Sequence, residues 1–109
     1  MAQEALGDIL YETRGRVAIL TINRPEARNS INAGVREGLF AGLARFEADP
    51  NVRAAILTAA GDQAFCAGAD LKEMSQMKLG VLPRNFLPII GETIEVRKPL
   101  IAAVNGAAY

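Results

Sequence analysis

The sequence predicts a mixed fold, either α/β or α+β, in which helices cover buried strands. Short apolar and β-branched runs alternate along the chain with stretches whose apolar residues have helical spacing. The resulting order is strand, strand, helix, strand, helix, strand, which is typical of a layered fold. The chain has 109 residues, of which 50% are apolar, so we expect one globular domain.

Two strands are expected near the beginning of the chain. Residues 8–13 and 16–23 both have strand character, and the second segment is rich in β-branched side chains. Gly15 lies between them and marks a turn, so the two segments are predicted to form a hairpin. Pro25 then ends the pattern, because proline has no N–H to donate to a neighbouring strand.

Residues 32–48 have the spacing of a helix that Ser30 or Asn32 caps. Its apolar face consists of Val35, Leu39, Leu43 and Phe46. Three glycines recur at every fourth position, and each weakens a helix by about 1 kcal/mol relative to alanine. They are Gly34, Gly38 and Gly42. Because this spacing places them on one side, we expect close packing there against a neighbouring element.

The second half of the chain predicts two buried strands, residues 54–59 and 100–104, and a helix over residues 88–97. Ile90 and Ile94 are expected to face inward from that helix. Residues 74–87 have mixed polarity and are interpreted as a mobile connection. The predicted core consists of Ile19, Ile22, Leu39, Leu43, Phe46, Ile56, Leu57, Ile90, Ile101 and Val104.

The residue inventory excludes several classes of function. Twelve basic residues balance twelve acidic ones, which argues against nucleic acid and anionic membranes as partners. The chain has no histidine, so His-based acid–base catalysis and nearly all zinc sites are excluded, and we expect no metal. The single cysteine, Cys66, cannot form an internal disulfide. It is interpreted as a small buried side chain in a reducing compartment, and we expect a cytoplasmic protein.

The two ends of the chain carry separate expectations. The first residues lack the basic and apolar regions of a secretory signal, and no apolar run is long enough to span a bilayer. The last residues, 105–109, directly follow an apolar run with no polar tail, which is unusual at the end of a domain. We therefore expect a truncated chain or a fragment.

Residues 64–74 are the segment with the clearest chemical content. They follow a predicted strand, and their small side chains let a ligand approach the backbone closely. Asp70, with Glu73 three residues later, resembles a capping box and predicts a helix that starts at Asp70. N–H groups near such a start suit an anion or a developing oxyanion. A tight strand-to-helix turn without a ligand explains the same residues.

Residues 65–74, Phe-Cys-Ala-Gly-Ala-Asp-Leu-Lys-Glu-Met, resemble the first signature of the enoyl-CoA hydratase/isomerase (crotonase) family. Three other segments resemble the family in the same order, namely residues 23–32, 49–58 and 98–106. The resemblance implies a fold of stacked ββα units, the ClpP/crotonase fold, incomplete at its C-terminus. Residues 1–109 would be the N-terminal part of a single domain. It also implies an acyl-CoA substrate, no cofactor beyond the coenzyme A of that substrate, and a homo-trimer or hexamer.

The resemblance also assigns residues to roles. Ala69 aligns with the residue whose backbone N–H forms half of the family's oxyanion hole. Coenzyme A contacts are implied for Ala27, Arg28, Ala67, Gly68, Asp70, Leu71 and Lys72. Arg28 could pair with a phosphate, but a solvated loop arginine is an equally good interpretation. Asp70 is expected to cap a helix rather than act as a base, because its carboxylate binds local N–H groups.

Enoyl-CoA hydratase is the activity that the resemblance favours. The alternatives are a sister activity, such as an isomerase, dehalogenase or thioester hydrolase, and a non-catalytic acyl-CoA-binding or structural member. The family's second oxyanion donor and its two hydratase glutamates align beyond Tyr109. We therefore expect residues 1–109 alone to lack hydratase activity.

Overall fold

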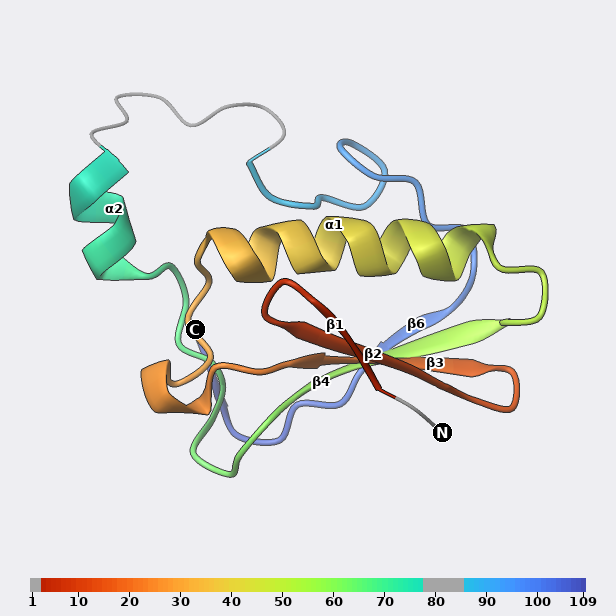
Figure 1. Ribbon diagram of the computed structural model, residues 1–109, viewed down its shortest axis with the longest axis horizontal. Helices are drawn as coiled ribbons and strands as arrows, with labels where there is room; N and C mark the ends of the chain where they lie inside the picture. Colours follow the sequence, from red (N-terminus) through yellow and green to blue (C-terminus); the bar gives the residue numbers. More distant parts are fainter. Residues whose placement is uncertain (1–2, 78–85) are drawn as a thin grey trace.

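The computed structural model describes residues 3–77 and 86–109, which form a mixed α/β fold (Figure 1). The larger sheet has five strands in the order β1 (Glu4–Leu6), β2 (Ile9–Arg14), β3 (Val17–Ile22), β4 (Ala54–Ala59) and β6 (Leu100–Ala102). A second sheet pairs β5 (Ala64–Cys66) with β7 (Ala107–Ala108). The helical elements are the 3-10 turn η1 (Pro25–Ala27), α1 (Ala33–Ala48) and α2 (Leu71–Met77).

The large sheet combines an antiparallel half with a parallel half. Strands β1, β2 and β3 are antiparallel, and Gly15 adopts a left-handed conformation (φ +60°) at the turn of the predicted hairpin. Strand β4 is parallel to β3, and β6 is parallel to β4. A parallel pair needs a crossover, and α1 supplies it between β3 and β4 while lying along one face of the sheet (Figure 1). The hairpin and the central helix are both confirmed.

Helix α1 begins with the side chain of Asn32, whose Oδ1 accepts a hydrogen bond from the Val35 N–H at 2.9 Å. The glycine side of the helix lies against the sheet as expected. A methyl group at Gly38 would collide with the carbonyl oxygen of Leu6, and one at Gly42 would lie 2.8 Å from Leu20 Cδ2. This close approach lets the sheet cover the helix and offsets the low helix propensity of glycine.

The core lies between α1 and the sheet. Of the predicted core residues, four are buried: Ile22, Leu39, Leu43 and Phe46. Three more are half-buried: Ile19, Ile56 and Leu57. The prediction is wrong for Ile90, Ile101 and Val104, which are 52%, 57% and 55% exposed. Ile101 is in register with Ile19 and Ile56, on the face of the sheet opposite to α1, and Val104 lies beyond the end of β6.

The strand predicted over residues 100–104 is therefore shorter and more exposed than expected. It ends at Ala102, and only Leu100 packs against the core. The predicted mobile connection, residues 74–87, is also partly wrong. Its first residues form the last turn of α2, which ends at Met77, whereas residues 78–85 lie outside the described part of the chain.

The helix predicted over residues 88–97 does not form. Gly91 adopts φ +87°, a left-handed conformation that a helix does not contain. The hydroxyl of Thr93 accepts a hydrogen bond from the Ile89 N–H and donates one to the Leu87 carbonyl, both at 2.7 Å. These side-chain bonds compete with the helical pattern and stabilise a tight turn. Ile90 therefore points to solvent, although its spacing from Ile94 fits a helix face.

Candidate functional site

Two segments that are far apart in the sequence pair beside each other to form the candidate site. The Ile31 N–H donates to the Gly68 carbonyl at 2.7 Å, and the Asp70 N–H donates to the Ile31 carbonyl at 3.0 Å. The Ala67 N–H also donates to the Arg28 carbonyl at 3.1 Å. This short parallel pairing brings the predicted coenzyme A residues near Arg28 next to those around Gly68.

The backbone of Ala69 lies at the free edge of this pairing. In a parallel pair, one residue bonds to the two residues that flank its partner, so the partner's own N–H points to the opposite edge. Here Ile31 bonds to Gly68 and Asp70, and Ala69 is the partner. Within residues 3–77 and 86–109, no backbone acceptor or side chain is bonded to the Ala69 N–H. Ala69 is also an exposed residue, which makes its N–H a candidate donor for a ligand.

The last residue of the chain lies beside this segment (Figure 1). Strand β7 runs parallel to β5, and the Tyr109 N–H donates to the Cys66 carbonyl at 3.0 Å. A Cβ atom on Gly68 would lie 4.0 Å from that of Tyr109. Gly68 itself has φ +92°, which accounts for glycine at this bend. Cys66 is buried and free of disulfides, in agreement with its expected structural role.

The carboxylate of Asp70 is fully occupied by two different partners. Its Oδ1 accepts the Glu73 N–H at 3.0 Å, which confirms the predicted cap. Its Oδ2 binds Arg24 Nη1 at 3.1 Å. The Glu73 N–H lowers the pKa of Asp70 most, and Arg24 lowers it further. Asp70 is therefore ionised at neutral pH and unsuited to act as a general acid.

Glu73 does not complete the predicted capping box. The Asp70 N–H already donates to Ile31, so the Glu73 carboxylate turns to α1 instead. It accepts the Ala33 N–H at 2.7 Å and pairs with Arg36 at 2.6 Å. The first turns of α1 and α2 are thus joined through one side chain.

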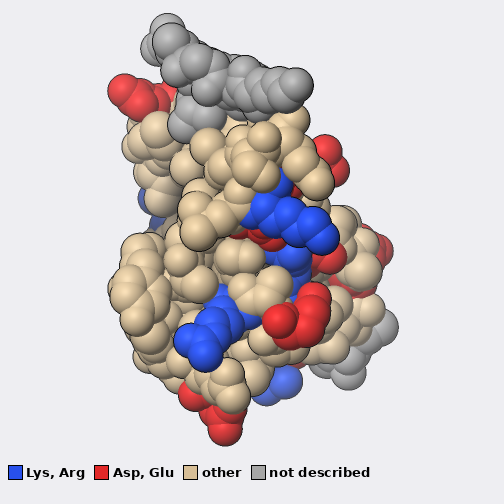
Figure 2. Space-filling view, turned by 90° about the vertical axis from the view of Figure 1, so that its left-hand side faces the viewer, with Lys and Arg blue, Asp and Glu red and all other residues tan. Residues whose placement is uncertain are grey.

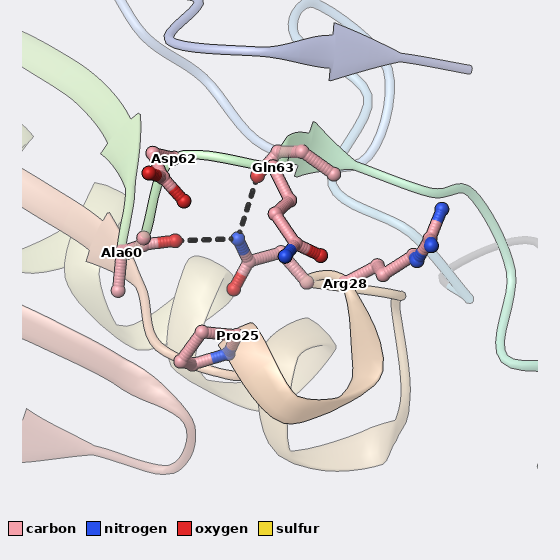
Figure 3. A pocket seen from close by; sticks show the side chains of 8 residues that line it. Pro25, Arg28, Ala60, Asp62 and Gln63 are labelled. Atoms are coloured by element: carbon pink, nitrogen blue, oxygen red, sulfur yellow. Dashed lines mark hydrogen bonds between the residues drawn. The ribbon is translucent and has the colours of Figure 1, made fainter.

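Asn29 ties the segment after β3 to β4 and β5. Its backbone is left-handed (φ +57°), and the residue is 1% exposed. Its Nδ2 donates to the carbonyls of Ala60 and Ala64 at 2.9 and 2.8 Å (Figure 3). Its Oδ1 accepts the Arg24 N–H at 2.9 Å. One buried side-chain amide, that of Asn29, therefore makes all three of these hydrogen bonds.

A cavity of about 170 Å³ adjoins Asn29, between η1 and the residues that follow β4. Of the predicted site residues, only Arg28 lines it, and the Arg28 side chain extends away from Asp62 (Figure 3). The face that carries α2 shows both basic and acidic side chains rather than a surface of one sign (Figure 2). This mixed charge agrees with the balanced composition.

The structure places every predicted site residue in the two adjoining segments. Ala27, Ala67 and Gly68 are half-buried, whereas Arg28, Leu71 and Lys72 are exposed, Leu71 to 82%. Sequence reasoning missed Arg24 and Asn29. The available signal was a cluster of polar residues directly after the end of a strand, where side chains often hold neighbouring loops.

The chain belongs to the enoyl-CoA hydratase/isomerase family, because a sequence model of that family matches residues 12–109. The chain is 40% identical over 109 residues to a short-chain-enoyl-CoA hydratase of Clostridium acetobutylicum. It is 45% identical over 102 residues to a probable enoyl-CoA hydratase of Rhizobium meliloti. These alignments cover 94% and 92% of the chain but only 41% and 39% of the relatives, so the chain spans about two fifths of their length.

Solved structures show the same relationship. A carnitinyl-CoA dehydratase from Mycobacterium avium superimposes with a TM-score of 0.76 at 47% identity, covering 91% of this chain and 40% of that one. An enoyl-CoA hydratase from Mycobacterium tuberculosis superimposes with a TM-score of 0.73 at 40% identity, covering 91% and 39%. The predicted family and its crotonase-like fold are confirmed. None of the described helices is long and apolar enough to cross a membrane.

Proposed function

We propose that the whole protein that carries this chain is an enoyl-CoA hydratase, and that Ala69 supplies one donor of its oxyanion hole. The observation that carries this proposal is the N–H of the exposed residue Ala69, which points away from the pairing with Ile31. The printed names of several relatives support the hydratase activity. Residues 1–109 would then be the N-terminal part of one catalytic domain.

The proposed reaction adds water to the 2,3-double bond of an acyl-CoA. The water oxygen bonds to C3, a proton bonds to C2, and the negative charge in between resides on the thioester oxygen. A backbone N–H aimed at that oxygen stabilises the enolate more than the ground-state carbonyl. The nearby carboxylates of Asp70 and Glu73 bind arginines and N–H groups. We therefore assign the activation of water to groups outside this chain.

We assign coenzyme A to the edge formed by the two paired segments, residues 28–31 and 67–70. Arg28 and Lys72 present exposed cations for phosphate groups, and Leu71 presents exposed apolar surface. Ala27, Ala67 and Gly68 leave room for a ligand close to the backbone. Asp70 contributes by holding this segment in place, since both carboxylate oxygens and both backbone polar groups already have partners in the protein. No other cofactor is needed for this chemistry.

A sister activity is the second candidate. Relatives of similar identity act on different acyl groups by name, among them a carnitinyl-CoA dehydratase and an (E)-benzylidenesuccinyl-CoA hydratase. An isomerase, dehalogenase or thioester hydrolase would use the same donor with other acid–base groups. A non-catalytic acyl-CoA-binding or structural member is a separate alternative, which would lack those groups. We further propose a cytoplasmic homo-trimer or hexamer. The exposed apolar side chains of Ile101 and Val104 need cover, which the rest of the domain or a further subunit would supply.

Hydration of crotonyl-CoA by the whole protein tests the proposal, followed as loss of absorbance of the conjugated thioester. Ala69→Pro removes the N–H, and we expect turnover to fall about a hundredfold or more. Ala69→Gly removes only the methyl group and should retain more activity than Ala69→Pro. Residues 1–109 alone should show no hydration. A folded Ala69→Pro protein with wild-type turnover would refute the role of this donor.

A further inference from the structure

The direction of the Ala69 N–H depends on restraints from its neighbours. Gly68 precedes it with φ +92°, and glycine has little conformational preference of its own. Asp70 follows it and is bound at three points, through its N–H to Ile31, through Oδ1 to Glu73 and through Oδ2 to Arg24. The Ala69 N–H shares its peptide with the Gly68 carbonyl, which accepts the Ile31 N–H at 2.7 Å. Its direction is therefore held from both sides, as long as residues 28–31 stay paired with residues 67–70.

Arg24 connects that restraint to the rigid sheet. It lies two residues beyond Ile22, the last residue of β3. Its Nη1 donates to the Ser30 carbonyl at 2.8 Å and to Ser30 Oγ at 3.1 Å, as well as to Asp70 Oδ2 at 3.1 Å. One guanidinium group thus holds both paired segments, on either side of the bridge between Ile31 and Ala69.

The pair between Arg24 and Asp70 is shielded from water. Both side chains are 16% exposed, whereas those of the surface pair Arg97 and Glu95 are 77% and 69% exposed. Exposed pairs are weakened by solvent and by side-chain entropy, and partly buried pairs hold a fixed geometry better. Glu73 also restrains α2, but it acts on the first turn of the helix rather than on the residue beside Ala69.

We propose that Arg24 is a positioning residue for the hydratase reaction. Through Ser30 and Asp70 it holds the two paired segments together and so fixes the peptide that carries the Ala69 N–H, which is then aimed at the thioester oxygen before substrate binds. This inference rests on the proposed function, because it concerns the same donor. Arg24 does not contact the reacting atoms, and Asp70 acts with it as one unit rather than as an acid or a base.

Four variants of the whole protein test the inference: Arg24→Met, Asp70→Asn, the double variant and Arg24→Lys. Asparagine is a good helix cap, so Asp70→Asn removes the ion pair while keeping the bond to the Glu73 N–H. Arg24→Met and Asp70→Asn should each lower kcat for crotonyl-CoA about 10- to 100-fold. KM should change less than about threefold, because a misplaced catalytic group costs turnover more than binding. Arg24→Lys should recover part of the loss. Arg16→Met, at the exposed hairpin turn, is the matched control.

The double variant separates a joint role from two independent ones. If the residues act as a unit, it should be no slower than the slower single variant. The absorbance of a bound chromophoric enoyl-CoA supplies a second readout, because polarisation of its carbonyl shifts the band to longer wavelength. We expect a smaller shift in Arg24→Met and in Asp70→Asn, which a merely stabilising role would not produce.

If the wild-type protein is active and Arg24→Met and Asp70→Asn keep its kcat and its spectral shift, the positioning role is overturned while the proposed function stands. Multiplicative losses in the double variant would also overturn the positioning role. A wild-type protein without activity towards any enoyl-CoA would instead overturn the proposed function, which is a different result. If Arg24→Met does not fold, as judged by circular dichroism, Asp70→Asn and Arg24→Lys decide the question.

Discussion

Replacement of Asn29 by alanine should destabilise the protein strongly, because this buried amide joins three segments. It makes three hydrogen bonds, two to the carbonyls of Ala60 and Ala64 and one from the Arg24 N–H. Each is worth about 1 kcal/mol net, and a left-handed alanine costs about 1 kcal/mol more, so we expect a loss of about 4 kcal/mol. A domain is typically stable by about 5–15 kcal/mol, so this change is a large fraction of the total.

Urea unfolding of the whole protein measures this loss. Asn29→Gly separates the two causes, since glycine is not strained at φ +57° and should be about 1 kcal/mol less destabilised than alanine. Asn51→Ala is the matched control, because Asn51 is exposed and its side chain makes no hydrogen bond to the described residues. That control should change the free energy of unfolding by less than about 0.5 kcal/mol. An Asn29→Ala protein within about 1 kcal/mol of wild type would refute the reasoning.

Two further changes probe the core and the charge next to Ala69. Leu43 is a buried residue of α1, 5% exposed, so Leu43→Ala should cost about 2–5 kcal/mol in urea unfolding. A loss no larger than that of a surface change would contradict the helix register. The lowered pKa of Asp70 means that its carboxylate stabilises the fold above its unfolded-state pKa, and that this contribution is lost as the pH falls through the folded-state pKa. Wild-type and Asp70→Asn proteins should therefore converge in stability on acidification, and a difference that grows towards low pH would exclude this account.

Local patterns were sufficient to predict the elements whose partners lie nearby in the sequence. The hairpin at Gly15 and the cap at Asn32 depend on a few adjacent residues, and both form as expected. Residues 88–97 show where such patterns fail. The spacing of Ile90 and Ile94 fits a helix, but it also fits the turn that Gly91 and Thr93 stabilise. The burial predicted for Ile101 failed because its side chain lies on the face of the sheet that α1 does not cover, and which face is covered depends on topology.

The candidate site divides in the same way. The short side chains around Ala69 and the cap at Asp70 are local features, and they pointed to the segment that pairs with residues 28–31. The groups that hold this segment are not local, because Arg24 reaches Asp70 across 46 positions and Asn29 reaches Ala64 across 35. The free edge at Ala69 exists only because Ile31 occupies the other edge, and that pairing forms after both segments are placed by the sheet. Whether a backbone N–H is free is therefore a property of the assembled fold. The small side chains that let a ligand approach that N–H can be predicted from the sequence.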